Sequence, residues 1–167
     1  MKKIFLLLAI FISIKCFALD PSVIEIRALY RDAANHSSSC KKLILLLSSY
    51  NEKNNTLLAG YKAAATMVMA KHCFSPISKL SYFSKGKYLL EQSINADKNN
   101  IELRFLRFAL QTNIPFFLGY KGAINSDKTF LINHYYKIED SQLKHWLISF
   151  LKASENLTAA EKQSLKE

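Results

Sequence analysis

The chain has 167 residues, and its 23 basic side chains exceed its 13 acidic ones to give a formal charge of +10 at pH 7. Four glycines and three prolines are too few for the many tight turns of a β-barrel or β-sandwich, so the composition argues against these folds. The basic residues are spread thinly, which argues against a nucleic-acid partner. They form either an ordinary solvated surface or a basic face for anionic lipid or glycan of a cell envelope.

Residues 1–18 have the three parts of a secretory signal peptide. A charged start precedes the apolar segment Ile4 to Ile14, and Cys16 to Ala18 offer small residues for cleavage. This apolar segment is shorter than the ~20 residues of a transmembrane helix, and no other run in the sequence is long enough. We therefore expect an exported protein, periplasmic or secreted, with a single domain over residues 19–167 and no transmembrane anchor after cleavage.

Hydrophobic periodicity and turn signals divide the mature chain into seven to eight helices. Asp20-Pro21 is a typical helix start, and Ser126, Asp140 and a capping box at Thr158 are expected to begin later helices. No convincing strand-like alternation is present, so we predict an all-α fold. The expected helices cover about 20–35, 40–50, 56–73, 79–96, 101–112 and 126–136, with two more beginning at 140 and 158.

Residues 86–107 indicate how these helices are arranged. Gly86, Leu90 and Ser93 place a small, a large and a small side chain on one helix face, and 97–100 form a polar turn before the next apolar helix. This stretch resembles the tetratricopeptide repeat, a helical hairpin with the same packing pattern before a similar turn. The resemblance implies antiparallel hairpins stacked as a short tetratricopeptide-like array, without specifying an activity. The chain is also similar to small uncharacterised secreted bacterial proteins.

The apolar faces of the helices predict the core. Leu90, Leu106, Leu110 and Trp146 each lie on the apolar side of a periodic segment. Residues 113–122 break the periodicity with a proline and two glycines, although they contain three aromatic side chains that favour burial. We therefore expect an ordered connector that lies over the core.

Catalysis has no support in the sequence. The four histidines lack the spacing of metal ligands, no serine lies in a nucleophile elbow, and no glycine-rich phosphate loop is present. We expect a protein that is not an enzyme and that holds no metal and no cofactor. Cys40 and Cys73, the two cysteines of the mature chain, form either a disulfide or two separate thiols.

The candidate binding residues are Arg104, Arg107, Tyr61 and Tyr88. Spacing of three places both guanidinium groups on one face of an otherwise apolar helix. They either clamp a carboxylate or phosphate of a partner or bridge acids such as Glu91 on a neighbouring helix. The two tyrosines either line a groove for a peptide or lie in the core.

Two hypotheses of function follow from these features. The first is a non-enzymatic interaction module of the bacterial cell envelope, in which stacked hairpins present a groove to a protein or peptide partner. The alternative is a small envelope carrier or hydrolase with an apolar pocket beneath the connector at 113–122. An open concave face favours the module, and a closed apolar cavity with converging polar groups favours the alternative.

Overall fold

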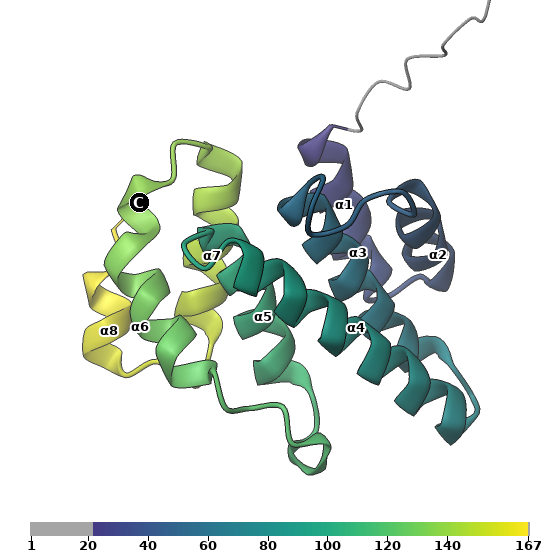
Figure 1. The fold of residues 1–167 in the computed structure, drawn as a ribbon. Helices are drawn as coiled ribbons and strands as arrows, with labels where there is room; N and C mark the ends of the chain where they lie inside the picture. The colour runs from purple at the N-terminus through teal and green to yellow at the C-terminus, as the bar shows by residue number, and fades with distance from the viewer. Residues whose placement is uncertain (1–21, 167) are drawn as a thin grey trace, which may run out of the picture.

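The computed structural model describes residues 22–166, which form eight α-helices and three short 3₁₀ helices and contain no strand (Figure 1). The all-α prediction is confirmed over this part of the chain, whereas the predicted signal peptide and the Asp20-Pro21 start lie outside the described residues. The α-helices are α1 (Val23–Ala33), α2 (Ser37–Leu46), α3 (Thr56–Met69), α4 (Pro76–Ala96), α5 (Ile101–Asn113), α6 (Ile124–His134), α7 (Ser141–Ala153) and α8 (Ala159–Ser164).

Capping side chains explain where four of the helices begin. Asn55, Asn100, Asp140 and Thr158 each accept a hydrogen bond from the backbone N–H three residues ahead, which has no partner inside the helix. Glu161 completes a capping box by accepting from the Thr158 N–H at 2.7 Å. The helix starts predicted at residues 140 and 158 are therefore confirmed.

Three other predicted helix starts are wrong by two or three residues. The second helix begins at Ser37 rather than at residue 40. The fourth helix begins at Pro76 rather than at residue 79, because a proline in the first turn lacks only an N–H that would have no helical partner. The sixth helix begins at Ile124, so Ser126 is not its cap. Its hydroxyl instead donates to the Ala123 carbonyl at 3.0 Å, inside the first turn.

The α3–α4 hairpin is held close by two glycines. A Cβ at Gly86 of α4 would lie 2.6 Å from the Met67 nitrogen and 2.7 Å from the Ala63 oxygen, both backbone atoms of α3. A Cβ at Gly60 of α3 would meet the Leu103 side chain of α5. The small residues on these faces therefore let α3 pack tightly against two neighbours at once.

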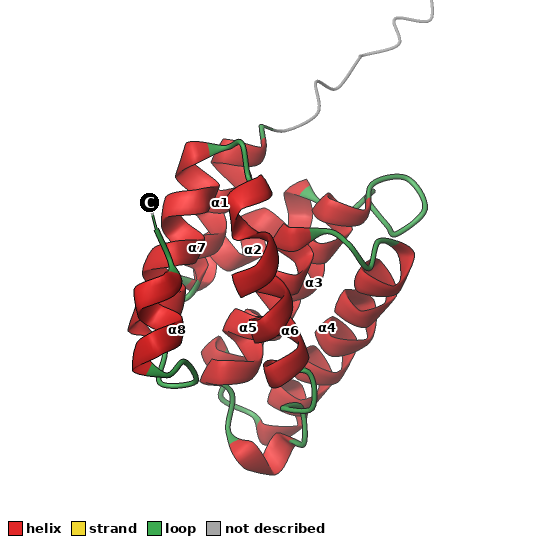
Figure 2. Ribbon diagram, turned by 90° about the vertical axis from the view of Figure 1, so that its left-hand side faces the viewer, coloured by secondary structure: helices red, strands yellow, loops and turns green. Residues whose placement is uncertain are grey.

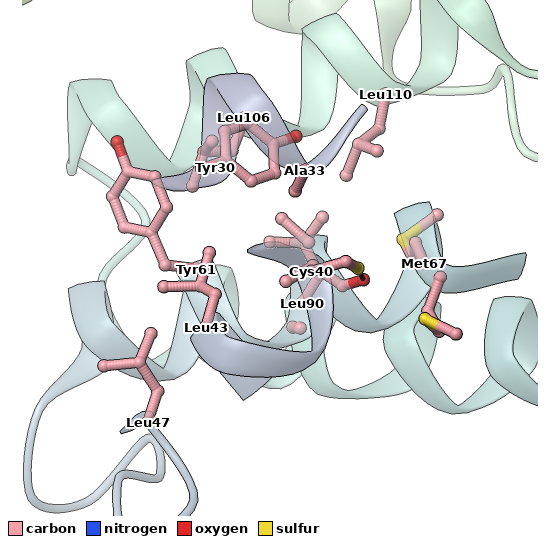
Figure 3. Packing of buried hydrophobic residues seen from close by; sticks show 14 of the residues in the cluster. Tyr30, Ala33, Cys40, Leu43, Leu47, Tyr61, Met67, Leu90, Leu106 and Leu110 are labelled. Atoms are coloured by element: carbon pink, nitrogen blue, oxygen red, sulfur yellow. Dashed lines mark hydrogen bonds between the residues drawn. The ribbon is translucent and has the colours of Figure 1, made fainter. Parts of the chain in front are cut away.

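The core has two parts that lie on opposite sides of α5, and both Figure 1 and Figure 2 show α5 between the other helices. Leu103, Leu106 and Leu110 of α5 belong to the first cluster, which α1 to α4 complete (Figure 3). Phe105 and Phe108 belong to the second cluster, with residues of α6, α7 and the C-terminal segment. The periodicity of α5 is therefore that of a helix buried on two sides.

The predicted core residues are buried with one exception. Leu90, Leu106 and Leu110 are buried in the first cluster. Trp146 of α7 is only partly buried and packs against both clusters. Its ring makes edge contacts with Tyr30 at 6.3 Å and Phe105 at 4.7 Å between centroids, so it lies at the seam of the two clusters.

Replacing Gly86 by alanine tests the close approach of α3 and α4. The added methyl group meets backbone atoms, which cannot rotate away, so we expect the free energy of unfolding to fall by about 1–3 kcal/mol. The gain in helix propensity, ~1 kcal/mol, offsets only part of this loss. Urea unfolding followed by circular dichroism measures the change.

Gly122→Ala is the matched control. Nothing lies within 4 Å of a Cβ added there, and its φ is not positive, so the free energy of unfolding should change by less than about 0.5 kcal/mol. A Gly86→Ala protein as stable as the wild type would contradict the α3–α4 packing described above.

Candidate functional site

Arg104 and Arg107 of α5 lie in a network of charged side chains against α6 and α4. Arg107 makes two hydrogen bonds to Asp127, at 2.7 Å from Nε and 2.8 Å from Nη2, and a third to Glu91 at 2.7 Å. The Arg104 Nε forms an ion pair with the same Asp127 carboxylate. Tyr120 donates its hydroxyl to Glu91. The bridge between Arg107 and Glu91, one of the two arrangements expected from the sequence, is present.

In this network the guanidinium of Arg107 is bound by carboxylates of the protein itself. Burial by itself lowers the pKa of Arg107, but the hydrogen bond to Asp127 and the charges of Asp127 and Glu91 raise it above its ordinary value, so the side chain stays charged. Asp127 is fully buried, and its negative charge is neutralised by the ion pairs with Arg104 and Arg107. A partner's anion could engage Arg107 only by leaving this carboxylate unpaired, which is costly.

A second network joins α1, α3 and α5 to the start of α7. Arg27 makes hydrogen bonds of 2.6 and 2.8 Å to Glu102 and one of 2.6 Å to Asp140, the capping residue of α7. Tyr61 donates its hydroxyl to Glu102. The hydrogen bond to Glu102 is the main cause that raises the pKa of Arg27, whereas burial, followed by the charge of Glu102, raises that of Tyr61. Tyr61 is completely buried, so it lies in the core and not in an open groove.

The sequence contained a signal for this second network that was missed. Arg27 shares the buried face of α1 with Ile26, Tyr30 and Ala33. A charged residue on an apolar helix face needs an oppositely charged partner, because an unpaired buried charge is strongly unfavourable. The identity of that partner could not be read from spacing, since Glu102 is 75 residues away.

The four predicted binding residues do not come together in one place. Arg104 and Arg107 belong to the network of Asp127, Tyr61 belongs to that of Glu102, and Tyr88 of α4 is 64% exposed. No hydrogen bond or ion pair links Tyr88 to the other three in the described part of the chain. The structure therefore directs attention to another surface as the candidate site.

Cys40 and Cys73 are free thiols in this structure, which is the second of the two arrangements that the sequence left open. The buried Cys40 thiol donates to the Ala65 carbonyl at 3.0 Å, and Cys73 donates to the Met69 carbonyl at 3.4 Å. Burial, with a smaller contribution from Cys73, raises the pKa of Cys40 to about 11. The Cys40 thiol is therefore unreactive in the folded protein at neutral pH.

The candidate site is a cleft of about 1160 Å³ between α1, α3, α4, α5, α7 and the connector at 113–122. Its walls are mostly apolar and include Met67, Phe83, Leu110, Leu118 and Trp146. Figure 3 shows Met67 and Leu110 approaching from α3 and α5 on opposite sides. The cleft is partly open to solvent. Its volume slightly exceeds the roughly 300–1,000 Å³ of typical ligand pockets.

The charged side chains that line this cleft are all basic. Arg31 of α1, Lys71 after α3 and Lys79 of α4 are exposed, and no aspartate or glutamate is among the lining residues. The Arg31 guanidinium lies 5.9 Å from the centre of the Trp146 ring, and the Lys71 ammonium donates to the Ala34 carbonyl at 2.9 Å. The cleft therefore suits an apolar ligand with negative charge at its edge.

The connector at 113–122 forms one wall of the cleft. Ile114 and Leu118 pack against the first core cluster, and Tyr120 is buried in it, so this part of the prediction is confirmed. Phe116 and Phe117 differ from the expectation, because both are 83% exposed in the short helix η2 (Phe116–Leu118). Proline and glycine shape this segment as a projecting turn, which leaves the two rings outside the core.

Other kinds of site find no support in residues 22–166. No group of three or more histidine, cysteine, aspartate or glutamate side chains is placed to hold a metal ion there. None of the described helices is long and apolar enough to cross a membrane. A scan against protein-family models matches no family, and comparisons with the curated proteins and with the solved structures give no match.

Arg107→Gln tests whether the arginine network supports the fold. Asp127 would lose its two-point partner inside the protein, so we expect the free energy of unfolding to fall by about 3–5 kcal/mol. The exposed Arg31, replaced by glutamine as a matched control, should change stability by less than about 1 kcal/mol, because it loses only an exposed cation–π contact with Trp146. If both variants are as stable as the wild type in urea, the network does not hold the fold together.

Alkylation of the two cysteines tests their accessibility. We expect iodoacetamide to modify the half-buried Cys73 in the native protein and to modify Cys40 only after unfolding, because Cys40 is buried and its pKa is about 11. Mass spectrometry of peptides reports the modified site. Protection of both residues without reductant, and release of both by reductant, would instead demonstrate a disulfide.

Proposed function

We propose that this protein is a non-enzymatic binding module that is exported to the bacterial cell envelope and receives an apolar segment of a protein or peptide partner. The observation that carries the proposal is the cleft of about 1160 Å³, with its largely apolar walls and only basic charged side chains. Export rests on the signal peptide predicted at residues 1–18. The short tetratricopeptide-like array belongs to the same proposal and is supported by the buried faces of Gly86, Leu90 and Ser93.

The chemistry of the cleft favours binding over catalysis. Its polar side chains are three cations, Arg31, Lys71 and Lys79, together with Asn113 and the Tyr30 hydroxyl. No carboxylate or histidine in the described lining is placed to move a proton beside a nucleophile. Apolar walls from several helices instead offer a surface against which a partner can bury the apolar face of a helix or strand.

A small carrier is the second candidate, and one observation favours it. The connector forms part of the cleft wall through Pro115, Phe117 and Leu118, which is where the carrier hypothesis requires an apolar pocket. A ligand with an acyl chain and an anionic head would place its chain among these walls and its charge near Arg31 or Lys71. The partial opening of the cleft to solvent favours the module, because an extended partner can enter from the side.

Leu80→Asp tests the proposal at the cleft. Leu80 lines the cleft and is 57% exposed, so a carboxylate there should repel an apolar partner without removing a core side chain. Leu45→Asp on α2 is the matched control, since Leu45 is 75% exposed and does not line the cleft. We expect capture of a partner from envelope extract to fall by about tenfold with Leu80→Asp and to be unchanged with Leu45→Asp.

The fluorescence of Trp146 separates the two candidates. It is the only tryptophan in the chain and lines the cleft, so a ligand bound there changes its emission. A change on adding the captured partner, and none on adding decanoate, supports the module. A change in emission on adding decanoate, and none on adding the captured partner, supports the carrier. Equal capture by both aspartate variants and the wild type would contradict a binding role for the cleft.

A further inference from the structure

The most exposed large apolar side chains of the described chain lie in two turns. Phe74 is fully exposed, Phe116 and Phe117 are each 83% exposed, and Ile77 is 82% exposed. Scattered exposed leucines are ordinary on a protein surface, but several strongly exposed aromatic and aliphatic side chains grouped in two places mark an interaction surface. We name Phe74 with Ile77 the first tip, and Phe116 with Phe117 the second tip.

The two tips project from the same end of the molecule, on either side of the cleft. The first tip lies at the turn from η1 (Ala70–His72) to α4, and the second lies in η2. Figure 1 shows both turns at the lower end of the fold. Phe117 of the second tip itself lines the cleft, and so do residues beside both tips, namely Pro76 and Leu80 next to the first and Pro115 and Leu118 next to the second.

The chain segments around both tips lack negative charge. Residues 53–90 contain six lysines and no aspartate or glutamate, and residues 103–126 contain Arg104, Arg107 and Lys121 and again no acid. The two arginines are neutralised internally, so the charge beside the tips comes from Lys71 and Lys79 near the first tip and from Lys121 near the second. The charge therefore selects a partner that is anionic.

We propose that the two tips dock this protein on an anionic lipid bilayer, with the four apolar side chains inserted between the lipid headgroups and the surrounding lysines above them. Exposed aromatic and aliphatic side chains enter the boundary between headgroups and acyl chains, and each nearby lysine adds attraction to an anionic surface. A bilayer accepts separate projecting turns because it has no fixed shape to match. The proposal specifies the basic face for anionic envelope lipid that the composition left open.

A second copy of the chain fits this surface less well. Two copies meeting through their tips would bring Lys71, Lys79 and Lys121 of both copies together, and like charges oppose this contact. The docking proposal goes beyond the proposed function and does not depend on the occupant of the cleft. Phe74, Ile77 and Phe116 do not line the cleft, so they can be changed without altering its walls.

The test measures flotation of the purified protein with lipid vesicles. We expect binding to vesicles of phosphatidylcholine mixed with phosphatidylglycerol, weak binding to phosphatidylcholine alone, and a loss of binding as salt rises. The double variant Phe74→Ser/Phe116→Ser should bind the mixed vesicles about tenfold more weakly or worse. Ile77→Ser should weaken binding in the same direction.

The matched control is Leu45→Ser/Tyr136→Ser, which removes two apolar side chains that are 75% and 63% exposed and lie outside the tips. It should bind the mixed vesicles like the wild type. All variants should keep the wild-type melting temperature, because each changed side chain is exposed.

Three results would overturn the docking proposal. The first is that the wild type does not bind the mixed vesicles. The second is that the variant Phe74→Ser/Phe116→Ser binds them as well as the wild type does. The third is that the control Leu45→Ser/Tyr136→Ser loses as much vesicle binding as the tip variant does. Absence of vesicle binding together with intact capture by the cleft would reject membrane docking and leave the proposed function standing. Loss of capture in Leu80→Asp with vesicle binding retained would support both.

Discussion

The neutralisation of charged side chains on a doubly buried helix is the constraint on which the rest of this structure depends. α5 has apolar clusters on two sides, yet it also carries Glu102 and Arg107, which are 5% and 8% exposed. Each needs an opposite charge from another helix, because an unpaired charge at such a depth is strongly unfavourable. Arg27 from α1 meets the first need and Asp127 from α6 meets the second. These bonds set α1 and α6 at defined positions along α5, where apolar contacts alone would tolerate sliding.

The same constraint decides which surfaces remain for function. The arginines that looked like ligand-binding residues in the sequence have partners within the protein, and Tyr61 and Tyr120 donate to the same two sets of carboxylates. The surfaces outside these two networks are the apolar cleft, with its exposed Lys71 and Lys79, and the two tips beside it. The surfaces that we propose for binding are therefore apolar with basic surroundings, whereas the strongest polar interactions are internal.

The local features could be predicted from the sequence, and the long-range ones could not. The helices, the caps at Asp140 and Thr158 and the small face of α4 follow from spacing over a few residues. The partners of Arg27 lie 75 and 113 residues away, beyond any periodic signal. The cleft was partly foreseen at the connector, but its opposite wall comes from the ends of α3 and α4. Phe116 and Phe117 looked like core residues because composition does not show on which side of a turn a ring projects.

The position of α5 between the two clusters bears on how the protein unfolds. In a simple stack of hairpins each repeat contacts only its neighbours, so the ends can separate from the rest. Here the leucines of α5 complete one cluster and its phenylalanines complete the other, on a single rigid helix. If the helices around one cluster unfold, one side of α5 becomes exposed and one of its ion pairs, to Arg27 or to Asp127, is broken. The loss of support for α5 lowers the stability of the other cluster. The two clusters are therefore coupled into one cooperative unit, and a destabilising substitution in α5 lowers the stability of both clusters.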